Sequence, residues 1–338
     1  MGFDIIDIRR FEPREFSSLL DAESDAWGDV LHWDFAPSVR VINSCLRDKR
    51  LSGYALVEAG LIRGYCFFFY DGEKSMIGDL FLHPEVAGQR LERRLLDHVL
   101  ETLMATPGLR RIEAQLPHFD REQLEPAFLA HKFRSYQRRF MKLRLGERPG
   151  KGSSHGESTA PPPARKLRVP GDIRLIPWHR GYDQEAAELL YQAYRHHVDA
   201  VINDQYASVT GATRLLENIV YHQGCGEFLP RISQLAVHHP SEMLAGLLTV
   251  TAIRRPTAHI PQVAVAAAFQ GRGVGTALMD AAFEDLDQDG FDEVTLTVTD
   301  ANAGALRLYE KIGFETFKEF GAFIYNRDGI YSASQPQD

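Results

Sequence analysis

The feature that most constrains the fold of this chain is a glycine-punctuated turn between an apolar segment and a helical pattern. Val263 and Val265 close the apolar segment, and residues 270–275 (QGRGVG) then place three glycines in six positions. Apolar residues recur at helical spacing from Val274 to Leu286, which predicts a helix that begins inside the turn. The first amides of a helix lack partners within it and lie at the positive end of its dipole. Because glycine has no Cβ, a diphosphate can approach this backbone closely.

The turn alone also fits an ordinary strand-to-helix connection, so the residues that follow it are needed to decide. Residues 293–298 (EVTLTV) alternate like a strand, and Asn302 precedes a second helical pattern that ends at Gly313. The apolar face of this pattern, spaced i, i+3, i+4 and i+7, consists of Ala305, Leu308, Tyr309 and Ile312. The predicted order after the apolar segment is therefore turn, helix, strand and helix.

With these features the segment 263–314 resembles the GNAT superfamily, the GCN5-related N-acetyltransferases. In that family the motif Q/R-x-x-G-x-G/A binds the pyrophosphate of coenzyme A, and N-x-x-A-x-x-L-Y-x-K-x-G-F closes the cofactor site. The second motif is matched at the same spacing by Asn302, Ala305, Leu308, Tyr309, Lys311, Gly313 and Phe314. The resemblance implies an α+β fold, with a mixed, mostly antiparallel sheet flanked by helices, and acetyl-CoA as the co-substrate.

The resemblance also implies which residues bind acetyl-CoA. In the family, the strand before the glycine turn splays from its neighbour, and the pantetheine arm adds into the gap like an extra strand. Here that strand is residues 259–265, and Pro261, which cannot donate to a ladder, indicates an edge or a bulge. Asn302 fits a polar contact to the arm and fits a helix N-cap equally well. The predicted cofactor-binding residues are Val263, Val265, Gln270, Gly271, Arg272, Gly273, Val274, Gly275, Thr276 and Asn302.

Acetyl transfer to an amine needs a base for the amine and an acid for the departing thiolate. The predicted acid is Tyr309, since a phenol is protonated at neutral pH; the alternative for this residue is plain helix packing. The predicted base is His259, whose imidazole suits proton transfer near neutrality, although it also fits a strand surface. Four further candidates lie where the helical pattern 185–198 passes into a loop, a region that borders the acceptor site in the family: His196, His197, Asp199 and Asp204.

The length of 338 residues predicts two domains, because one core rarely supports so long a chain. Residues 147–170 are rich in Gly, Ser and Pro and are expected to form a flexible linker. This divides the chain into a module at 1–146, a module at 171–326 that carries the motifs, and a polar tail at 327–338.

The first module repeats the plan of the second at one constant offset along the chain. Leu82, Leu95 and Asp97 align with Val265, Leu278 and Asp280 without a gap, which predicts two GNAT-like modules in tandem. In the glycine turn, however, Arg90 and Glu92 replace Gly273 and Gly275, and Phe128 stands in for Tyr309 near the end of the repeat. Side chains therefore crowd the first helix turn, and a carboxylate stands where a diphosphate would bind. The N-terminal module is expected to have lost its cofactor site.

Composition and charge limit the class of acceptor molecule and the cellular compartment that we expect for this chain. Residues 171–338 hold 12 Lys and Arg against 22 Asp and Glu, and a negative field favours cationic small molecules over nucleic acid. The three cysteines are scattered and suit a reducing, cytoplasmic setting, no apolar run is long enough to span a membrane, and no metal-ligand spacing occurs.

The predicted function is direct acetyl transfer from acetyl-CoA to an amine, most simply that of a small molecule, by a monomer or a homodimer. Two alternatives stay open. In the first, the acceptor is the amine of a protein or peptide. In the second, the chain is an acyl-CoA-binding sensor or scaffold without turnover.

Overall fold

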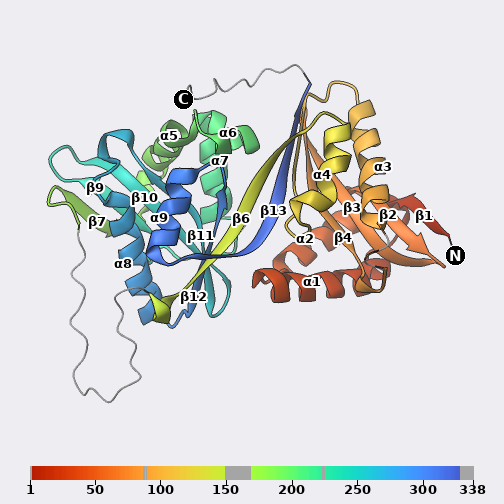
Figure 1. Cartoon of the computed structure of the whole chain (residues 1–338), viewed down its shortest axis with the longest axis horizontal. Helices are drawn as coiled ribbons and strands as arrows, with labels where there is room; N and C mark the ends of the chain where they lie inside the picture. Colours follow the sequence, from red (N-terminus) through yellow and green to blue (C-terminus); the bar gives the residue numbers. More distant parts are fainter. Residues whose placement is uncertain (1, 87, 89, 149–168, 223–224, 328–338) are drawn as a thin grey trace, which may run out of the picture. The chain divides into compact units, whose positions relative to one another are not determined.

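The chain folds into two compact units, and each is described by itself. The structure is a computed structural model that describes residues 2–86, 88, 90–148, 169–222 and 225–327 (Figure 1). The N-terminal unit comprises Met1–Arg138 and Lys318–Asp338, and the C-terminal unit comprises Arg139–Phe317.

The N-terminal unit is a mixed sheet with helices on both faces. Its strand order is β1-β2-β3-β4-β5-β13, and only β4 and β5 run parallel among the neighbours in this order. The strands are β1 (Phe3–Asp7), β2 (Ser52–Glu58), β3 (Leu61–Asp71), β4 (Lys74–Leu82), β5 (Arg111–Gln115) and β13 (Glu315–Asn326). The helices are α1 (Ser17–Leu31), α2 (Ala36–Arg47), α3 (Leu91–Ala105) and α4 (Arg121–Ala130).

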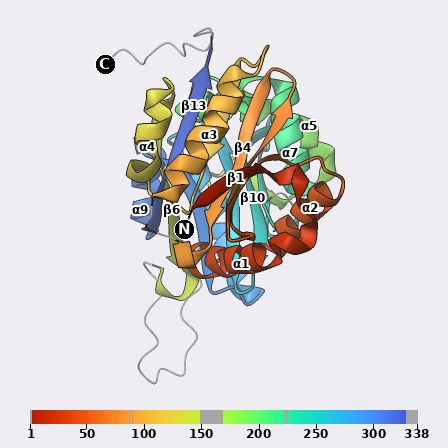
Figure 2. The same cartoon turned by 90° about the vertical axis from the view of Figure 1, so that its right-hand side faces the viewer.

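Successive residues of β3 point to opposite faces of the sheet and contribute to two separate cores in the N-terminal unit. Cys66 and Phe68 share a core with the apolar stripe of α3, which packs against β2, β3 and β4 (Figure 2). Tyr65 and Phe67 belong to the core under α1 and α2. Because successive strand residues point to opposite faces, one continuous apolar segment supplies both cores.

The C-terminal unit repeats this architecture. Its strand order is β6-β12-β11-β10-β9-β7, with a short strand β8 beside β10, and β11 runs parallel to β12. The strands are β6 (Arg134–Arg144), β7 (Ile173–Pro177), β8 (Glu227–Phe228), β9 (Gln234–His238), β10 (Met243–Arg254), β11 (Thr257–Val265) and β12 (Glu293–Thr299). The helices are α5 (Asp183–Tyr194), α6 (Val198–Ile202), α7 (Val209–Val220), α8 (Val274–Gln288) and α9 (Ala303–Ile312).

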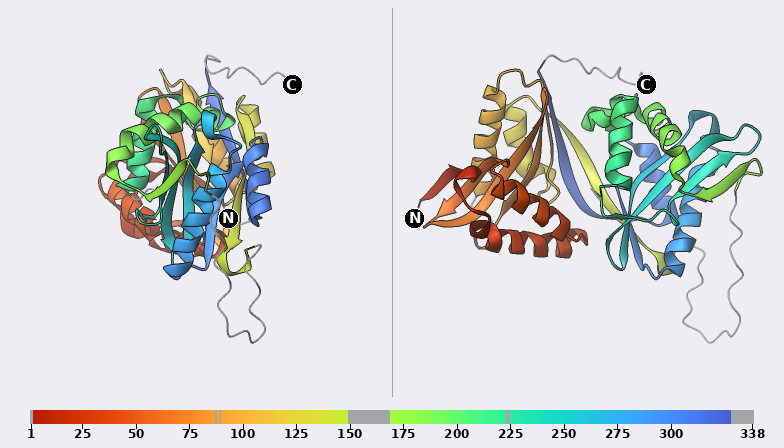
Figure 3. Two further views of the ribbon diagram at one scale, coloured as in Figure 1. Left: turned by 90° about the vertical axis from the view of Figure 1, so that its left-hand side faces the viewer. Right: turned by 180° about the vertical axis from the view of Figure 1, so that it is seen from behind.

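Helices cover both faces of this second sheet as well. Leu248 of β10 joins the core with α8 and α9, whereas its neighbour Leu247 joins the core with α5 and α7. Seen from behind, the green helices α5 and α7 lie over the strands, and α8 and α9 lie beyond them (Figure 3). The predicted α+β class with a mostly antiparallel sheet is confirmed.

The internal repeat is visible in the element boundaries. The offset that aligns Leu82 with Val265 also carries both ends of β4 onto β11 and both ends of α3 onto α8. The residues that precede the two helices, Arg90 and Gly273, both have left-handed backbone, with φ of 58° and 85°. The two units are therefore built on one plan, as the sequence repeat predicts.

The boundaries of the units differ from the predicted ones. The sequence-based division places residues 318–326 in the second module, but Lys318 onward belongs to the N-terminal unit, where Ala322–Asn326 pair antiparallel with β5. Phe323 of this segment stacks on Phe128 of α4, with ring centroids 4.0 Å apart. Conversely, residues 139–146 belong to the C-terminal unit. The sequence of a strand does not indicate which other strand it pairs with. A division made in chain order therefore assigns both segments to the wrong unit.

Most of the predicted linker and tail cannot be compared with the structure. Residues 149–168 and 328–338 lie outside the described residues.

Candidate functional site

A cavity of about 660 Å³ opens in the C-terminal unit where the glycine turn meets the sheet. Its walls come from the end of α5, the last residues of β11, the glycine turn, the first turn of α8 and the start of α9. The lining residues are Ala193, Tyr194, His197, Val263, Ala264, Val265, Phe269, Gln270, Gly271, Gly273, Val274, Gly275, Thr276, Asn302, Gly304, Ala305 and Leu308. Nine of the ten residues predicted to bind the cofactor are among them; the exception is Arg272.

The glycine turn presents bare backbone to this cavity. Gly271 and Gly273 have φ of 73° and 85°, a left-handed conformation that favours glycine, and a Cβ at either position would meet no heavy atom within 4 Å. Gly273 is the N-cap of α8 and no side chain caps it. The amides of the first turn are thus presented to an anion by a helix of 15 residues. The turn has the room and the polarity that a diphosphate requires.

Strand β11 leaves its parallel neighbour just before the cavity. Its pairing with β12 runs from Thr257 to Ile260 and stops there, and the next residue is Pro261. On the other side, the register with β10 shifts between His259 and Gln262. Since proline has no N–H to donate, it suits the point where the strands separate. Pro261 was predicted to mark an edge or a bulge, and the register shift lies at this position; Val263 and Val265 lie on the separated part.

Two side chains contact the separated part of β11. The Tyr194 hydroxyl donates to the carbonyl oxygen of Val263 at 3.0 Å, and Nε2 of Gln270 donates to the carbonyl oxygen of Val265 at 3.1 Å. Tyr194 thereby joins α5 to the strand. No sequence motif marks Tyr194, because its contact depends on the packing of α5 against the sheet.

Arg272 differs from its predicted neighbours. Its guanidinium donates to both carboxylate oxygens of Asp172, at 2.8 and 2.7 Å, and lies 5.5 Å from the centre of the Phe269 ring. The side chain is therefore held away from the cavity lining, and only its backbone belongs to the turn.

Asn302 lies both at the cavity wall and at the start of α9. Its Oδ1 accepts from the amide of Ala305 at 3.2 Å, which is an N-cap. The two roles weighed for this residue are compatible, because a cap made through Oδ1 leaves the donors of the side-chain amide for a ligand.

Tyr309 is buried beside the cavity and does not line it. It is 7% exposed, and its ring centroid lies 5.8 Å from that of Phe314. Burial raises the pKa of the phenol, and the negative charge of Asp199 and the nearby Tyr206 raise it further. The hydroxyl therefore stays protonated at neutral pH, as an acid must.

His259 lies farther along β11, in the part that is still paired with β12. It is 6% exposed, its Nδ1 lies 2.9 Å from Oγ1 of Thr295, and it is not a lining residue of the cavity.

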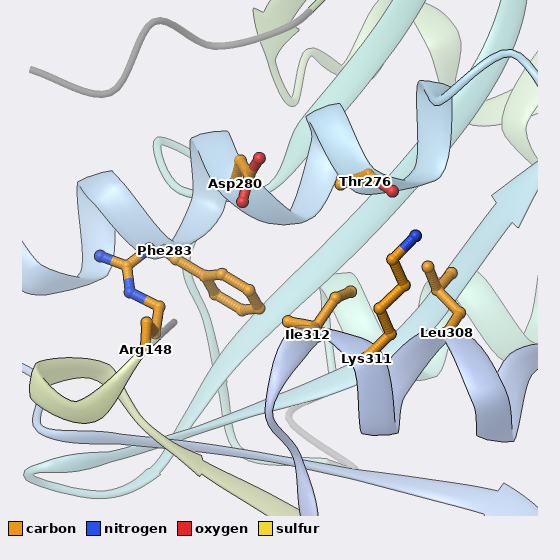
Figure 4. Close-up of a pocket in the computed structure, with 7 residues that line it drawn as sticks. All are labelled: Arg148, Thr276, Asp280, Phe283, Leu308, Lys311 and Ile312. Atoms are coloured by element: carbon orange, nitrogen blue, oxygen red, sulfur yellow. The ribbon is translucent and has the colours of Figure 1, made fainter. Parts of the chain in front are cut away.

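A smaller cavity of about 150 Å³ continues from the first, sharing Thr276 and Leu308 with it. Figure 4 shows Phe283 of α8 and Lys311 of α9 pointing into the space between the two helices, with Arg148 near its edge. The guanidinium of Arg148 lies 5.5 Å from the centre of the Phe283 ring. The lining of this cavity thus includes two cations, Arg148 and Lys311, and one carboxylate, Asp280. Arg148 was not predicted, because it precedes the linker and matches no motif.

In the N-terminal unit, different side chains occupy the region that corresponds to the larger cavity. The turn before α3 keeps the left-handed conformation, but Arg90 occupies the position of Gly273. Past the end of the β4–β5 pairing, Oδ1 of Asp79 accepts from the amide of Leu80 at 2.7 Å. Leu80 corresponds to Val263 at the repeat offset. A side chain therefore occupies the amide that an added strand would need.

Asp79 belongs to a buried acidic group in this unit. The hydroxyl of Tyr65 donates to Glu23, and Glu23 and Asp79 are 0% and 4% exposed. Burial raises the pKa of Asp79 to about 6 and holds the pKa of Glu23 well above its usual range, where the charge of Asp79 adds to the effect.

Two absences hold for the part of the chain that the structure describes. There, no group of three or more His, Cys, Asp or Glu is arranged to hold a metal ion. Within the same residues, none of the helices is both long enough and apolar enough to cross a membrane.

Comparisons with known proteins show what the second unit is similar to. The model of the Acetyltransferase (GNAT) family matches residues 235–314. An uncharacterized N-acetyltransferase of Methanocaldococcus jannaschii is 40% identical over 62 residues, which cover 18% of this chain and 27% of that protein. This chain thus aligns with about a quarter of that relative's length. A mycothiol acetyltransferase of Thermobispora bispora is 29% identical over 240 residues, or 70% of this chain and 72% of that protein.

Solved structures extend the likeness to nearly the whole chain. A GCN5-related N-acetyltransferase from Sphaerobacter thermophilus superposes with a TM-score of 0.63 at 18% identity, covering 96% of this chain and 95% of that one. A tandem GNAT protein from the clavulanic acid biosynthesis pathway gives a TM-score of 0.56 at 16% identity, covering 96% and 99%. At these identities the likeness concerns the fold, and it includes the tandem arrangement.

Proposed function

Because the chain belongs to the GNAT family of acetyltransferases as a tandem member, we propose that its C-terminal unit transfers the acetyl group of acetyl-CoA to the amine of a small molecule. The observation that carries the proposal is the larger cavity, which joins a bare helix N-terminus to the separated end of β11. The first suits a diphosphate, and the second suits an extended arm with amide groups.

Different residues of this unit would bind different parts of acetyl-CoA. The amides from Gly271 to Thr276 would hold the diphosphate, and the backbone of Val263 and Val265 would pair with the pantetheine arm. In the smaller cavity, Lys311 and Arg148 would offer positive charge to the remaining phosphate of the nucleotide, with the carboxylate of Asp280 in the same lining. Acetyl-CoA supplies an activated acyl group as a thioester, and the protein holds it next to the acceptor.

The chemistry at the thioester needs an acid for the departing sulfur. Tyr309 is the residue that we assign to this role, because it lies buried beside the cavity and its phenol holds a proton at neutral pH. No covalent intermediate on the enzyme is required when the amine attacks directly.

A small acceptor is favoured by two observations. Residues 171–338 carry a net excess of ten acidic residues over basic ones, which attracts a cationic amine. The Thermobispora relative is a mycothiol acetyltransferase, and mycothiol is a small molecule. A protein or peptide amine and a sensor without turnover are the alternatives.

We further propose that the N-terminal unit binds no cofactor. Arg90 stands where the second unit has a glycine, and Asp79 occupies the backbone amide of Leu80. Arg90 removes the bare glycine backbone, Asp79 occupies an amide that an extended arm would need, and the carboxylate of Glu92 in the first turn of α3 repels a diphosphate.

The test is a coenzyme A release assay with four acceptor amines: glucosamine, cysteamine, spermidine and a lysine-containing peptide with a blocked N-terminus. Release with a small amine supports the proposal, and release with the peptide alone would favour a protein acceptor. Binding of acetyl-CoA without release from any of the four would favour the sensor.

A further inference from the structure

An acceptor amine must lose a proton before it attacks, and the larger cavity carries one imidazole. Among its lining residues, Tyr194 and His197 are the two whose side chains titrate. A tyrosine hydroxyl holds its proton at neutral pH, whereas an imidazole exchanges protons there. His197 is therefore the lining residue suited to accept a proton. The inference that follows rests on the proposed function.

The position of His197 is set by the junction of α5 and α6. The residue precedes α6, its ring meets that of Tyr194 edge-on with centroids 5.8 Å apart, and its side chain is 30% exposed. The ring of His197 is thus held on one side by Tyr194, and part of the side chain is exposed to solvent. Its neighbour His196 is exposed and does not line the cavity.

Asp199 orients this ring. Oδ2 of Asp199 lies 3.0 Å from Nδ1 of His197. A carboxylate oxygen only accepts, so this contact is a hydrogen bond when Nδ1 carries a proton, and the neutral ring then has its lone pair on Nε2. The amide of Asp199 donates to Nδ1 at 3.2 Å and caps α6 when Nδ1 carries no proton, so each tautomer of the ring has a contact with Asp199. The carboxylate balances the positive charge that the ring gains when Nε2 takes a proton.

Asp199 is itself held in place and acts on both His197 and Tyr309. Oγ1 of Thr299 donates to its Oδ1 at 2.6 Å, and its side chain is 14% exposed. Its negative charge is also one of the causes that raise the pKa of Tyr309, after burial. One carboxylate therefore lies beside the proton acceptor at His197 and helps to keep the proton on the phenol of Tyr309.

We infer that His197 is the general base of the acetyl transfer and that Asp199 is its positioning residue. Nε2 of His197 takes one proton from the acceptor ammonium and passes it to solvent. The nitrogen lone pair then forms the bond to the carbonyl carbon, and the C–S bond breaks. Tyr309 gives its proton to the sulfur and recovers one from the acylated nitrogen, so protons and charges balance. This assignment differs from the sequence-based prediction of His259, which lies on the part of β11 that is still paired with β12 and contacts Thr295.

The test compares His197→Gln with His196→Gln, a matched change one residue away on the exposed side. Coenzyme A release is measured from pH 6 to pH 10, with whichever of glucosamine, cysteamine, spermidine and the blocked peptide the unmodified chain acetylates fastest. Acetyl-CoA affinity is measured by calorimetry on each variant. Asp199→Asn reports on positioning.

His197→Gln is expected to lower kcat/KM about 100-fold near pH 7, with acetyl-CoA affinity unchanged. The deficit should shrink at alkaline pH, because the acceptor is then already neutral and needs no base. Asp199→Asn should show a smaller deficit with the same trend, and His196→Gln should match the unmodified chain.

A deficit that is the same at every pH, or no deficit, would overturn the inference. If the unmodified chain releases no coenzyme A with any of the four amines, the proposed function itself fails, and the inference fails with it. The first result leaves the unmodified enzyme active, so the two failures are distinguishable.

Discussion

Gly275→Glu is a direct probe of the predicted diphosphate site. Gly275 lies in the first turn of α8 and lines the larger cavity. Its backbone is not in the left-handed region, and a Cβ there would lie 3.6 Å from Cγ2 of Val265, an ordinary contact. A Cβ is therefore accommodated at this position without strain. The substitution also copies the N-terminal unit, where Glu92 holds the corresponding place in α3.

The expected loss of affinity follows from charge repulsion. A carboxylate at this position would stand roughly 6 Å from one phosphate charge, and such a pair interacts by Coulomb's law. With an effective dielectric constant between about 20 and 80, one such pair costs about 0.7 to 2.8 kcal/mol. The dissociation constant for acetyl-CoA should therefore rise about 3- to 100-fold, and the effect should shrink at high salt.

Calorimetric titration with acetyl-CoA measures this loss, and Gly275→Gln is the control of equal size without charge. If Glu and Gln weaken binding equally, the effect is steric. If Gly275→Glu binds as tightly as the unmodified chain at low salt, the diphosphate does not lie at this turn.

Two further predictions concern the acid and the buried carboxyls. Tyr309→Phe should lower kcat about tenfold or more while acetyl-CoA affinity stays the same, and full turnover at every pH would remove the phenol from the mechanism. In the N-terminal unit, burial raises the pKa of Asp79 to about 6, whereas an unfolded carboxyl titrates near 4. The folded state binds more protons between these values, so stability should fall as pH rises through about 6. Urea unfolding at pH 5 and pH 8 should show this fall, and Asp79→Asn should reduce it; an equal fall in both would exclude Asp79 as its source.

The part of the fold that the sequence predicts is the part with local signals. The glycine turn, the helix after it and the alternating period of the strands depend on nearest neighbours, and the structure has them at the expected positions. The constant offset of the repeat also appears in the boundaries of β4 and β11. These signals are encoded within single elements or in self-similarity.

No local signal predicts that β13, which follows the C-terminal unit in the chain, pairs with β5 of the N-terminal unit. Its residues after Lys318 read as an ordinary strand, and the choice of β5 as partner depends on a surface formed much earlier in the chain. The stacking of Phe323 on Phe128 shows why the pairing is stable once formed. Such contacts connect elements that chain order separates, so a prediction made in sequence order assigns the strand to the wrong unit.

In the candidate site, sequence motifs predict the backbone groups better than the side chains. The turn residues are specified by glycine, whose conformational role is local. Tyr194 and His197 reach the cavity only because α5 packs against β11, and the pairing of Arg272 with Asp172 joins two segments that are distant in the sequence. Orientations of this kind are set by tertiary packing, which no motif records.

Calorimetric titration of the unmodified chain with acetyl-CoA tests the central claim most directly. One cofactor site, in the C-terminal unit, predicts one equivalent bound per chain, and the same stoichiometry with weaker affinity for Gly275→Glu. Two equivalents would show that the N-terminal unit has kept a site despite Arg90 and Asp79. No binding would mean that the cavity has kept the shape of the family without its co-substrate.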